Sequence, residues 1–119
     1  MSLKRLNEKL NRDVELTKLS GLKNDQGKCR IELLPTKPLL MIGDVLTFGA
    51  KKYADHNWRG GFDYSRLIGA NLLHLLAFND GEDLDPESGL SHMAHAGCCT
   101  LFLLEQVAKG TGNDDRYKG

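Results

Sequence analysis

Apolar positions recur every three or four residues along most of the chain, the spacing that places them on one face of an α-helix. In residues 2–19 they form a narrow stripe on a charged segment, which predicts a short amphipathic helix or an arm. Longer apolar runs over residues 36–54, 64–79 and 92–109 predict core-forming helices. Residues 23–35 contain a short apolar run, but no other segment offers it a partner strand. The expected fold is therefore all-α, a small bundle of three to four main helices.

The helical spacing also assigns residues to the core. In the first long helix the expected core residues are Leu39, Ile42, Val45, Leu46, Gly49 and Tyr53. In the last helix they are Met93, Ala96, Gly97, Thr100, Leu101, Leu104 and Ala108. A glycine inside a helix costs about 1 kcal/mol relative to alanine. Gly43 and Gly49 are therefore expected to allow a close approach of another helix or a ligand.

Helix ends are indicated by the residue types that satisfy free backbone groups. Thr36 is expected to cap the first long helix and Asp63 the second, while Ser91 or Ser88 caps the last. Gly110 is expected to end that last helix.

Length and charge limit the classes of protein to consider. At 119 residues the chain forms one domain, which we divide into an N-terminal helix or arm (1–22), a helical domain (23–110) and a flexible tail (111–119). Sixteen basic and sixteen acidic side chains cancel, so no overall field attracts nucleic acid, and no nucleic-acid partner is expected. No stretch approaches the roughly 18 apolar residues of a membrane span, so no membrane partner is expected either.

The three cysteines, Cys29, Cys98 and Cys99, do not fit a disulfide framework or a zinc site. An odd number, with two adjacent in an apolar run, predicts buried free thiols and a reducing, cytoplasmic location. The N-terminus has no apolar signal segment. Cys98 and Cys99 are expected to be buried, and no serine lies in a nucleophile-elbow context, so nucleophilic catalysis has little support.

Residues 74–95 carry most of the candidate chemistry. His92 and His95 are three residues apart, so they share one face of a helix and can bind one divalent cation. His74 reaches them if its helix packs antiparallel to the last one. The crossover between the helices adds the acids Glu82, Asp83 and Asp85. Single histidines on helices are usually structural, but three beside an acidic loop indicate a metal or acid–base site.

A second group of residues has the chemistry of a nucleotide site. Basic side chains neutralise phosphates, an aromatic ring stacks on a base, and an amide can bind the base edge. Trp58 alone is more typical of a core residue at a helix end. The group as a whole consists of Lys51, Lys52, Tyr53, Asn57, Trp58, Arg59 and Arg66.

Three blocks of sequence resemble a known family. They are KNDQGKCRIELLP, LTFGAKKYADHNWRGG and RLIGANLLHLLAFNDGEDLDPESGLSHMAHAGCCTLFLLE. Together they resemble the phage and bacterial domain called dATP/dGTP diphosphohydrolase, N-terminal, over about residues 23–105. That domain is similar to the MazG-like all-α nucleotide pyrophosphohydrolases, which cleave nucleoside triphosphates to a monophosphate and pyrophosphate with Mg²⁺ or Mn²⁺.

The resemblance implies a fold and a class of substrate, whereas the site residues are selected from the histidines and acids of this sequence. MazG-type enzymes hold metals with Glu-x-x-Glu on one helix and Glu-x-x-Asp on the next, whereas the corresponding helices here offer His74 and His92-x-x-His95. The expected metal ligands are therefore His74, Glu82, Asp83, Asp85, His92 and His95, with Glu82 or Asp83 as the general base.

The leading hypothesis is a metal-dependent purine deoxynucleoside triphosphate pyrophosphohydrolase of phage type, with Mg²⁺ or Mn²⁺ as cofactor. The resembled relatives assemble as dimers or tetramers, so a homo-oligomer is expected. The alternative is a non-catalytic protein that sequesters a nucleotide or a nucleotide-derived signal. A third possibility is an interaction module without a ligand.

Overall fold

The computed structural model describes residues 2–9 and 27–119 of the chain, and these fall into two units, 1–34 and 35–119. In the first unit, residues 3–9 are helical and a short 3-10 helix, η1, spans Ile31–Leu33. Most of the predicted arm lies outside the described residues. The second unit contains every element that bears on the candidate site.

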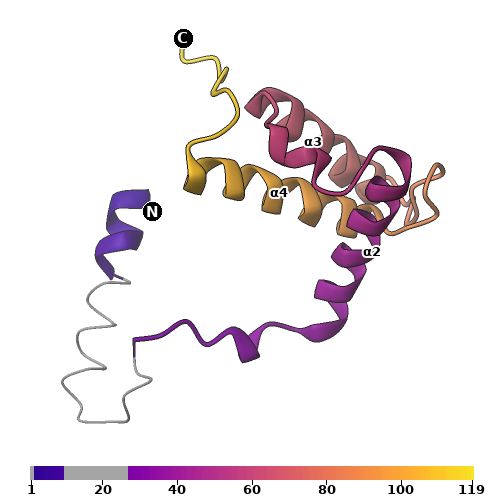
Figure 1. Ribbon diagram of the computed structural model, residues 1–119, viewed down its shortest axis with the longest axis horizontal. Helices are drawn as coiled ribbons and strands as arrows, with labels where there is room; N and C mark the ends of the chain where they lie inside the picture. Colours follow the sequence, from indigo (N-terminus) through magenta and orange to yellow (C-terminus); the bar gives the residue numbers. More distant parts are fainter. Residues whose placement is uncertain (1, 10–26) are drawn as a thin grey trace. The chain divides into compact units, whose positions relative to one another are not determined.

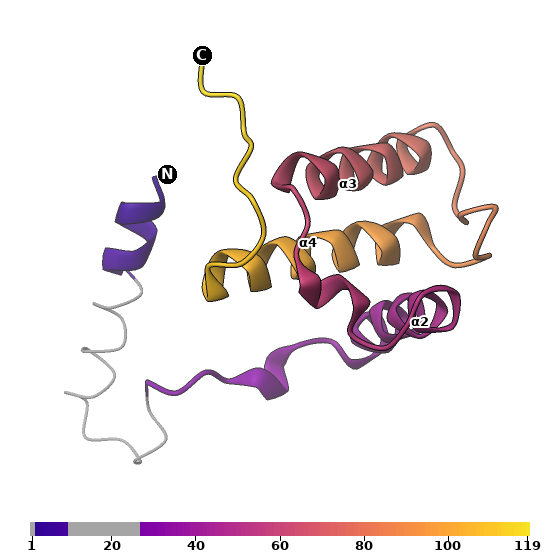
Figure 2. The same ribbon diagram turned by 45° about the horizontal axis from the view of Figure 1, so that its top comes forward.

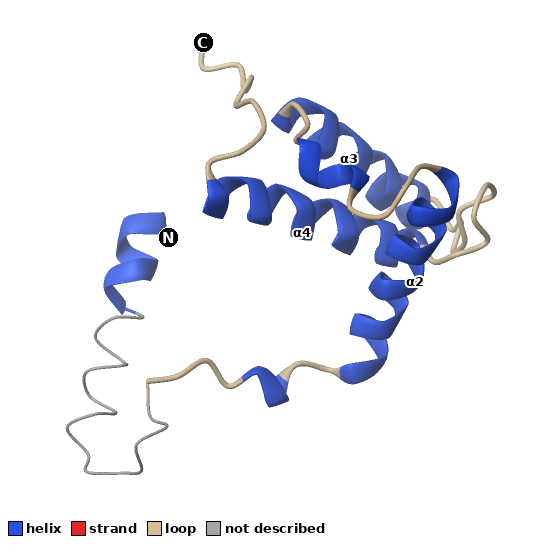
Figure 3. Cartoon of the chain, in the orientation of Figure 1, coloured by secondary structure: helices blue, strands red, loops and turns tan. Residues whose placement is uncertain are grey.

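Three α-helices make up the second unit (Figure 1). They are α2 (Thr36–Lys52), α3 (Tyr64–Asn79) and α4 (His92–Lys109), with a 3-10 helix, η2 (Asn57–Gly60), between α2 and α3. Both ribbon views show α3 and α4 side by side and α2 crossing α4 (Figure 2). Over the described ranges the structure has no strand, only two isolated β-bridges (Figure 3), which confirms the all-α prediction. None of the helices described is sufficiently long and apolar to span a bilayer.

The core of the second unit lies where α2 meets α4. Val45, Ala94 and Cys98 are buried together there, and the partly buried Ile42, Leu46, Leu90 and Phe102 pack around them. At Gly97 a Cβ atom would come within 2.9 Å of the Ile42 Cδ1 atom. The absence of a side chain at Gly97 therefore lets α2 and α4 approach closely. The expectation of a close helix at Gly43 or Gly49 was wrong, because no atom lies within 4 Å of a Cβ built at either position.

The predicted core faces were partly wrong. On α4, Met93, Leu101 and Leu104 are 42%, 44% and 62% exposed. Ala96 is buried as expected. Because α2 and α3 approach α4 from two sides, the small residues Ala94 and Cys98, which were not predicted to be core, are buried as well. On α2, Leu39 and Tyr53 are likewise exposed, whereas Val45 is buried as expected.

Two of the predicted helix caps were also wrong. Helix α2 begins at Thr36 itself, with Pro35 in the N-cap position and no side-chain cap. Asp63 occupies the N-cap position of α3, but its side chain makes no capping bond. The Asp115 carboxylate accepts hydrogen bonds from the Ser65 backbone N–H (2.8 Å) and hydroxyl (2.5 Å) instead. Ser91 caps α4 as predicted, by accepting from the Met93 N–H at 3.1 Å.

Gln106 of α4 connects the end of the domain to the loop before α3. It is 1% exposed, accepts a hydrogen bond from the Phe62 N–H (2.7 Å) and donates one to the Phe62 carbonyl (3.2 Å). Gly112 fits beside it with φ +73°, where a Cβ would lie 2.6 Å from the Gln106 Nε2 atom. Asn113 then pairs with Phe62 and Tyr64 through backbone bonds. The flexibility of residues 111–119 stays a prediction. The backbone bonds of Asn113 hold the start of this segment against the loop before α3.

The two hydrogen bonds between Gln106 and Phe62 predict that replacing Gln106 lowers the stability of the fold. Gln106→Leu removes both bonds and leaves the Phe62 N–H and carbonyl without their partner, which should lower the free energy of unfolding by about 2–3 kcal/mol. Urea denaturation measures this loss. As a control on the same helix, the exposed Lys109→Gln should change stability by less than about 0.5 kcal/mol. Equal, small changes in the two variants would contradict a role for Gln106 in stability.

Candidate functional site

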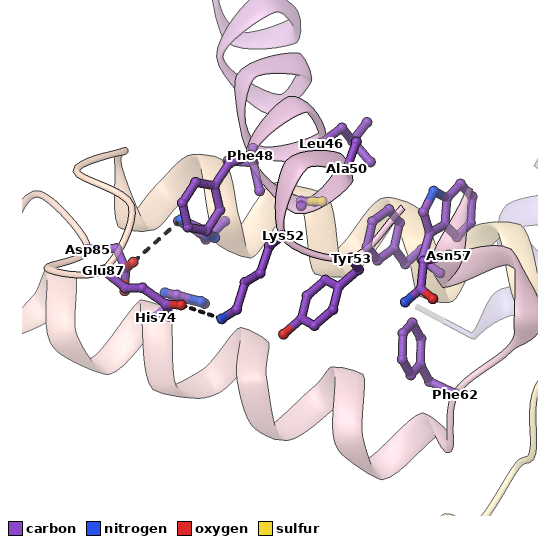
Figure 4. A pocket seen from close by; sticks show the side chains of 16 residues that line it. Leu46, Phe48, Ala50, Lys52, Tyr53, Asn57, Phe62, His74, Asp85 and Glu87 are labelled. Atoms are coloured by element: carbon purple, nitrogen blue, oxygen red, sulfur yellow. Dashed lines mark hydrogen bonds and ion pairs between the residues drawn. The ribbon is translucent and has the colours of Figure 1, made fainter. Parts of the chain in front are cut away.

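A cavity of about 480 Å³ opens between α2, α3, α4 and the crossover that joins α3 to α4. This volume lies within the range of pockets that bind small molecules. Figure 4 shows His74, Asp85 and Glu87 at one end of the cavity and Asn57 and Phe62 at the other. Lys52 and Tyr53, from the end of α2, lie between the two ends. The cavity therefore has an ionisable end and a largely aromatic end.

Three histidines meet at the ionisable end. The Nδ1 atoms of His74 and His92 are 2.9 Å apart, and the rings of His74 and His95 stack with centroids 4.6 Å apart. His74 and His95 line the cavity, whereas His92 lies behind them and is 4% exposed. This meeting requires α3 and α4 to be antiparallel neighbours, as the sequence predicted. The cluster is thus built from one turn of each helix.

The crossover loop is folded so that Asp85 faces the histidines. The Asp85 Oδ2 atom accepts hydrogen bonds from the Ser88 N–H (2.9 Å) and hydroxyl (3.0 Å). The Asp85 N–H donates to the Leu90 carbonyl at 2.8 Å, and Gly89 adopts a φ of +71° to close the turn. The Ser88 Oγ atom is also 2.7 Å from His95 Nε2. Asp85 is therefore held in place before any ligand binds.

Burial favours neutral His74 and His95, whereas hydrogen bonds from Ser88 favour an ionised Asp85. Burial lowers the pKa of the His74 imidazole, and the neighbouring His95 and His92 rings lower it further. Burial also lowers the pKa of His95, against the opposing effect of Asp85. For Asp85 itself burial would raise the pKa, but the bonds from Ser88 outweigh burial and bring the pKa below its ordinary value. Neutral imidazoles beside a carboxylate are the protonation states that bind metal ions.

The aromatic rings of the lining differ in how far they are covered. Trp58 stacks on Phe102 at 4.3 Å and 9°, and the Arg59 guanidinium lies 4.4 Å from the centre of the same indole. Because Phe102 and Arg59 cover the two faces of the indole, Trp58 serves as a wall of the cavity. Tyr53 is 65% exposed and also lines the cavity. Tyr53 is therefore the most exposed ring of the lining and is available to stack on a ligand.

Lys52 is the lysine that reaches the cavity. Its ammonium group pairs with the carboxylate of Glu87, which joins the end of α2 to the crossover loop. The hydrogen bond with Glu87 raises the pKa of Lys52. Cys98 also lines the cavity, but burial raises the pKa of its thiol to about 12, with a smaller effect from Cys99. The Cys98 thiol is therefore protonated near neutral pH and is a poor nucleophile.

The structure brings together some of the predicted site residues and not others. The predicted residues that line the cavity are Lys52, Tyr53, Asn57, Trp58, His74, Asp85 and His95. Glu82 accepts from His92 Nε2 at 2.6 Å, and the Asp83 backbone carbonyl accepts from the His92 N–H at 3.0 Å. Lys51, Arg59 and Arg66 are not part of the lining.

Sequence reasoning missed several residues of the cavity wall. Glu87 lies on the acidic crossover but was not among the predicted site residues, because nothing in the sequence indicates its pairing with Lys52. Phe102 lies seven residues after His95, which is about two helical turns, so its position on the histidine face was the available signal. Phe48 and Phe62 complete the apolar wall.

The residues at the ionisable end fit a divalent metal ion. One ligand atom from each of His74, Asp85 and His92 lies within 4.8 Å of the other two. Two imidazole nitrogens and one carboxylate oxygen are common ligands of transition-metal ions. Among the predicted metal ligands, His95 and Glu82 lie next to this trio, and Asp83 contributes a backbone carbonyl to His92.

Comparisons with known proteins agree with one another. A family model described as dATP/dGTP diphosphohydrolase, N-terminal, matches residues 18–116. A protein named dATP/dGTP diphosphohydrolase from Salmonella phage PMBT28 is 34% identical over 98 residues, which is 82% of this chain. The chain spans only about a third (33%) of the length of that relative. No solved structure matches. The chain therefore belongs to the family dATP/dGTP diphosphohydrolase, N-terminal.

Proposed function

We propose that the cavity binds a purine deoxynucleoside triphosphate and that the protein hydrolyses it, with a divalent metal ion, to the monophosphate and pyrophosphate. One observation carries the proposal: a single cavity combines a histidine–carboxylate end with an aromatic end that includes an amide. A nucleotide also has two different ends, with a charged phosphate chain at one end and a flat base at the other. The name of the phage relative supplies the purine deoxynucleotides as substrates.

The proposed reaction assigns a task to each part of the cavity. A water oxygen forms a bond to the α-phosphorus, the bond from that phosphorus to the bridging oxygen breaks, and pyrophosphate leaves. Lys52 neutralises phosphate charge, Tyr53 stacks on the base, and Asn57 offers a donor and an acceptor to the base edge. Lys51, Arg59 and Arg66 lie outside the lining, so their expected phosphate contacts stay predictions.

His74, His92 and Asp85 would hold the metal ion. Mg²⁺ or Mn²⁺, when bound, would supply charge neutralisation and a water molecule of lowered pKa. We retain Asp83 as the proposed general base that takes the proton of this water. The support for Asp83 is positional, because its carbonyl is bonded to the backbone N–H of His92.

The alternative is a protein that binds the nucleotide without cleaving it. Helix α3 has no acidic residue and α4 has only Glu105, so the paired carboxylates of MazG-type enzymes have no counterpart on these helices. The chain also spans a third of its phage relative. Calorimetry that shows tight binding without metal, followed by recovery of intact nucleotide, would decide for this alternative.

We further propose that the chain assembles as a dimer or tetramer in the cytoplasm of the host cell. Helix α3 exposes Leu72 (52%), Leu73 (70%) and Leu76 (59%). Helices that are apolar on all sides are usually covered by another element. Three free cysteines, at Cys29, Cys98 and Cys99, suit a reducing compartment.

The first test of this proposal is hydrolysis of a deoxynucleotide panel. With Mn²⁺ or Mg²⁺, dATP and dGTP should give the monophosphate and pyrophosphate, detected by chromatography. The double variant His92→Ala/His95→Ala should lose at least about 100-fold in rate, because one metal ligand and its neighbour are removed.

The fourth histidine provides the control for that test. His56 does not line the cavity, and its φ of 59° is one that asparagine tolerates, so His56→Asn should retain activity. Turnover without added metal, or a double variant as active as the parent, would count against the proposal.

Base stacking on Tyr53 predicts a selective loss of affinity. Tyr53→Ala should weaken nucleotide binding about 10- to 100-fold, the range expected when one base–aromatic stack is lost. Tyr53→Phe keeps the ring and should bind like the parent. Titration followed by the fluorescence of the single tryptophan, Trp58, measures both affinities. Tyr117→Ala, at a 94% exposed position, is the control. An unchanged affinity in Tyr53→Ala would remove Tyr53 from the site.

Assembly can be tested by light scattering. The parent should have the mass of a dimer or tetramer, and Leu73→Glu/Leu76→Glu should shift it to a monomer, because two charges would be buried in the interface. Lys109→Glu changes charge at an exposed position of α4 and should leave the mass unchanged. A monomeric parent would refute the assembly and leave the enzymatic proposal standing.

A further inference from the structure

His92 is the histidine whose two ring nitrogens both have partners. Its Nε2 atom is 2.6 Å from the Glu82 Oε1 atom, and its Nδ1 atom is 2.9 Å from His74 Nδ1. The His92 side chain is 5% exposed, whereas that of Glu82 is 52% exposed. Glu82 therefore reaches from the outside of the crossover to a buried ring.

The bond to Glu82 determines the tautomer of His92. An ionised carboxylate only accepts hydrogen bonds, so the proton of a neutral His92 lies on Nε2. The lone pair of His92 then lies on Nδ1 and points toward His74 Nδ1. Donation of the second ring N–H to a carboxylate is the usual arrangement of a histidine that binds a metal ion.

The distance between the two Nδ1 atoms suits a shared ion. Ligands at about 2.1 Å from one ion, and at a right angle to each other, lie about 3.0 Å apart. The observed separation is 2.9 Å, and an Asp85 oxygen lies within 4.8 Å of the ligand atoms of both histidines. Imidazole nitrogen is a good ligand for transition-metal ions, whereas Mg²⁺ prefers oxygen and retains its water molecules.

We infer that Glu82 is a positioning residue that holds His92 so that its Nδ1 atom can bind a metal ion. With His92 held in this way, His74, His92 and Asp85 bind a first-row transition-metal ion in preference to Mg²⁺. They bind this ion before the nucleotide binds. The inference rests on the proposed metal site and gives Glu82 a different task from the general base that the sequence suggested. It also selects between the two cofactors expected, because Mn²⁺ is a transition-metal ion and Mg²⁺ is not.

The test measures metal binding without nucleotide. Free Mn²⁺ is followed by electron paramagnetic resonance, and the absorption bands of bound Co²⁺ report the ligand geometry. The parent should bind Mn²⁺ and keep it in a 100-fold excess of Mg²⁺. Glu82→Ala should weaken Mn²⁺ binding about 10- to 100-fold, and Glu82→Gln, which keeps a neutral acceptor, should weaken it less. Asp80→Asn removes a charge from the same crossover and should bind Mn²⁺ like the parent.

A second measurement separates positioning from a general loss of structure. Long-range proton–nitrogen NMR correlations of the metal-free protein should show His92 with its proton on Nε2 in the parent and a mixture of tautomers in Glu82→Ala. Equal Mn²⁺ affinity in Glu82→Ala and the parent, an unchanged tautomer, or displacement of Mn²⁺ by equimolar Mg²⁺ would each overturn the inference. Hydrolysis by a protein that fails these tests would leave the proposed function intact. Transition-metal binding without hydrolysis would refute the proposed function alone.

Discussion

Three small residues on one side of α4, Ala94, Gly97 and Cys98, let α2 lie directly against that helix. Any larger side chain at Gly97 would meet Ile42, because a Cβ there already comes within 2.9 Å of it. The close approach matters for the site, since the last turn of α2 carries Lys52 and is followed at once by Tyr53. Without α2 in this position, the histidines of α3 and α4 would face open solvent and the cavity would lose one wall.

Burial also sets the chemistry of the histidines. Partial burial lowers the pKa of His74 and His95, whereas Asp85 keeps its charge because Ser88 donates two hydrogen bonds to it. The same surroundings thus favour neutral nitrogen ligands and an anionic oxygen ligand. Packing between helices and hydrogen bonds within one loop together prepare the cluster, without a contribution from a ligand.

Much of the fold and part of the site could be predicted from the sequence. The three long helices follow from helical spacing, and the short crossover requires the antiparallel pairing that brings His74 to His92 and His95. The selection of Asp85 among five acids in residues 80–87 could not be predicted, because it depends on bonds to Ser88 and Leu90 in the folded loop.

Contacts between residues far apart in the sequence could not be predicted either. The capping of α3 by Asp115 joins residues 50 positions apart, and a local pattern contains no sign of it. Phe102, 44 positions after Trp58, covers one face of its ring, a contact that agrees with the core role favoured for Trp58 alone but that no local pattern identifies. The face of α4 that is buried was also misjudged, since spacing alone does not reveal that two helices approach it from different sides.

The proposed metal ligands carry little negative charge. Four carboxylates would largely cancel the charge of bound divalent ions, whereas His74, His92 and Asp85 contribute a single negative charge. An ion held by these three would therefore keep a net positive charge toward a triphosphate. Of the lysines and arginines in the described ranges, Lys52 alone lines the cavity, and it is paired with Glu87. A site of this composition would draw most of its attraction for phosphate from the ion, so binding of the substrate would depend on an ion held by His74, His92 and Asp85.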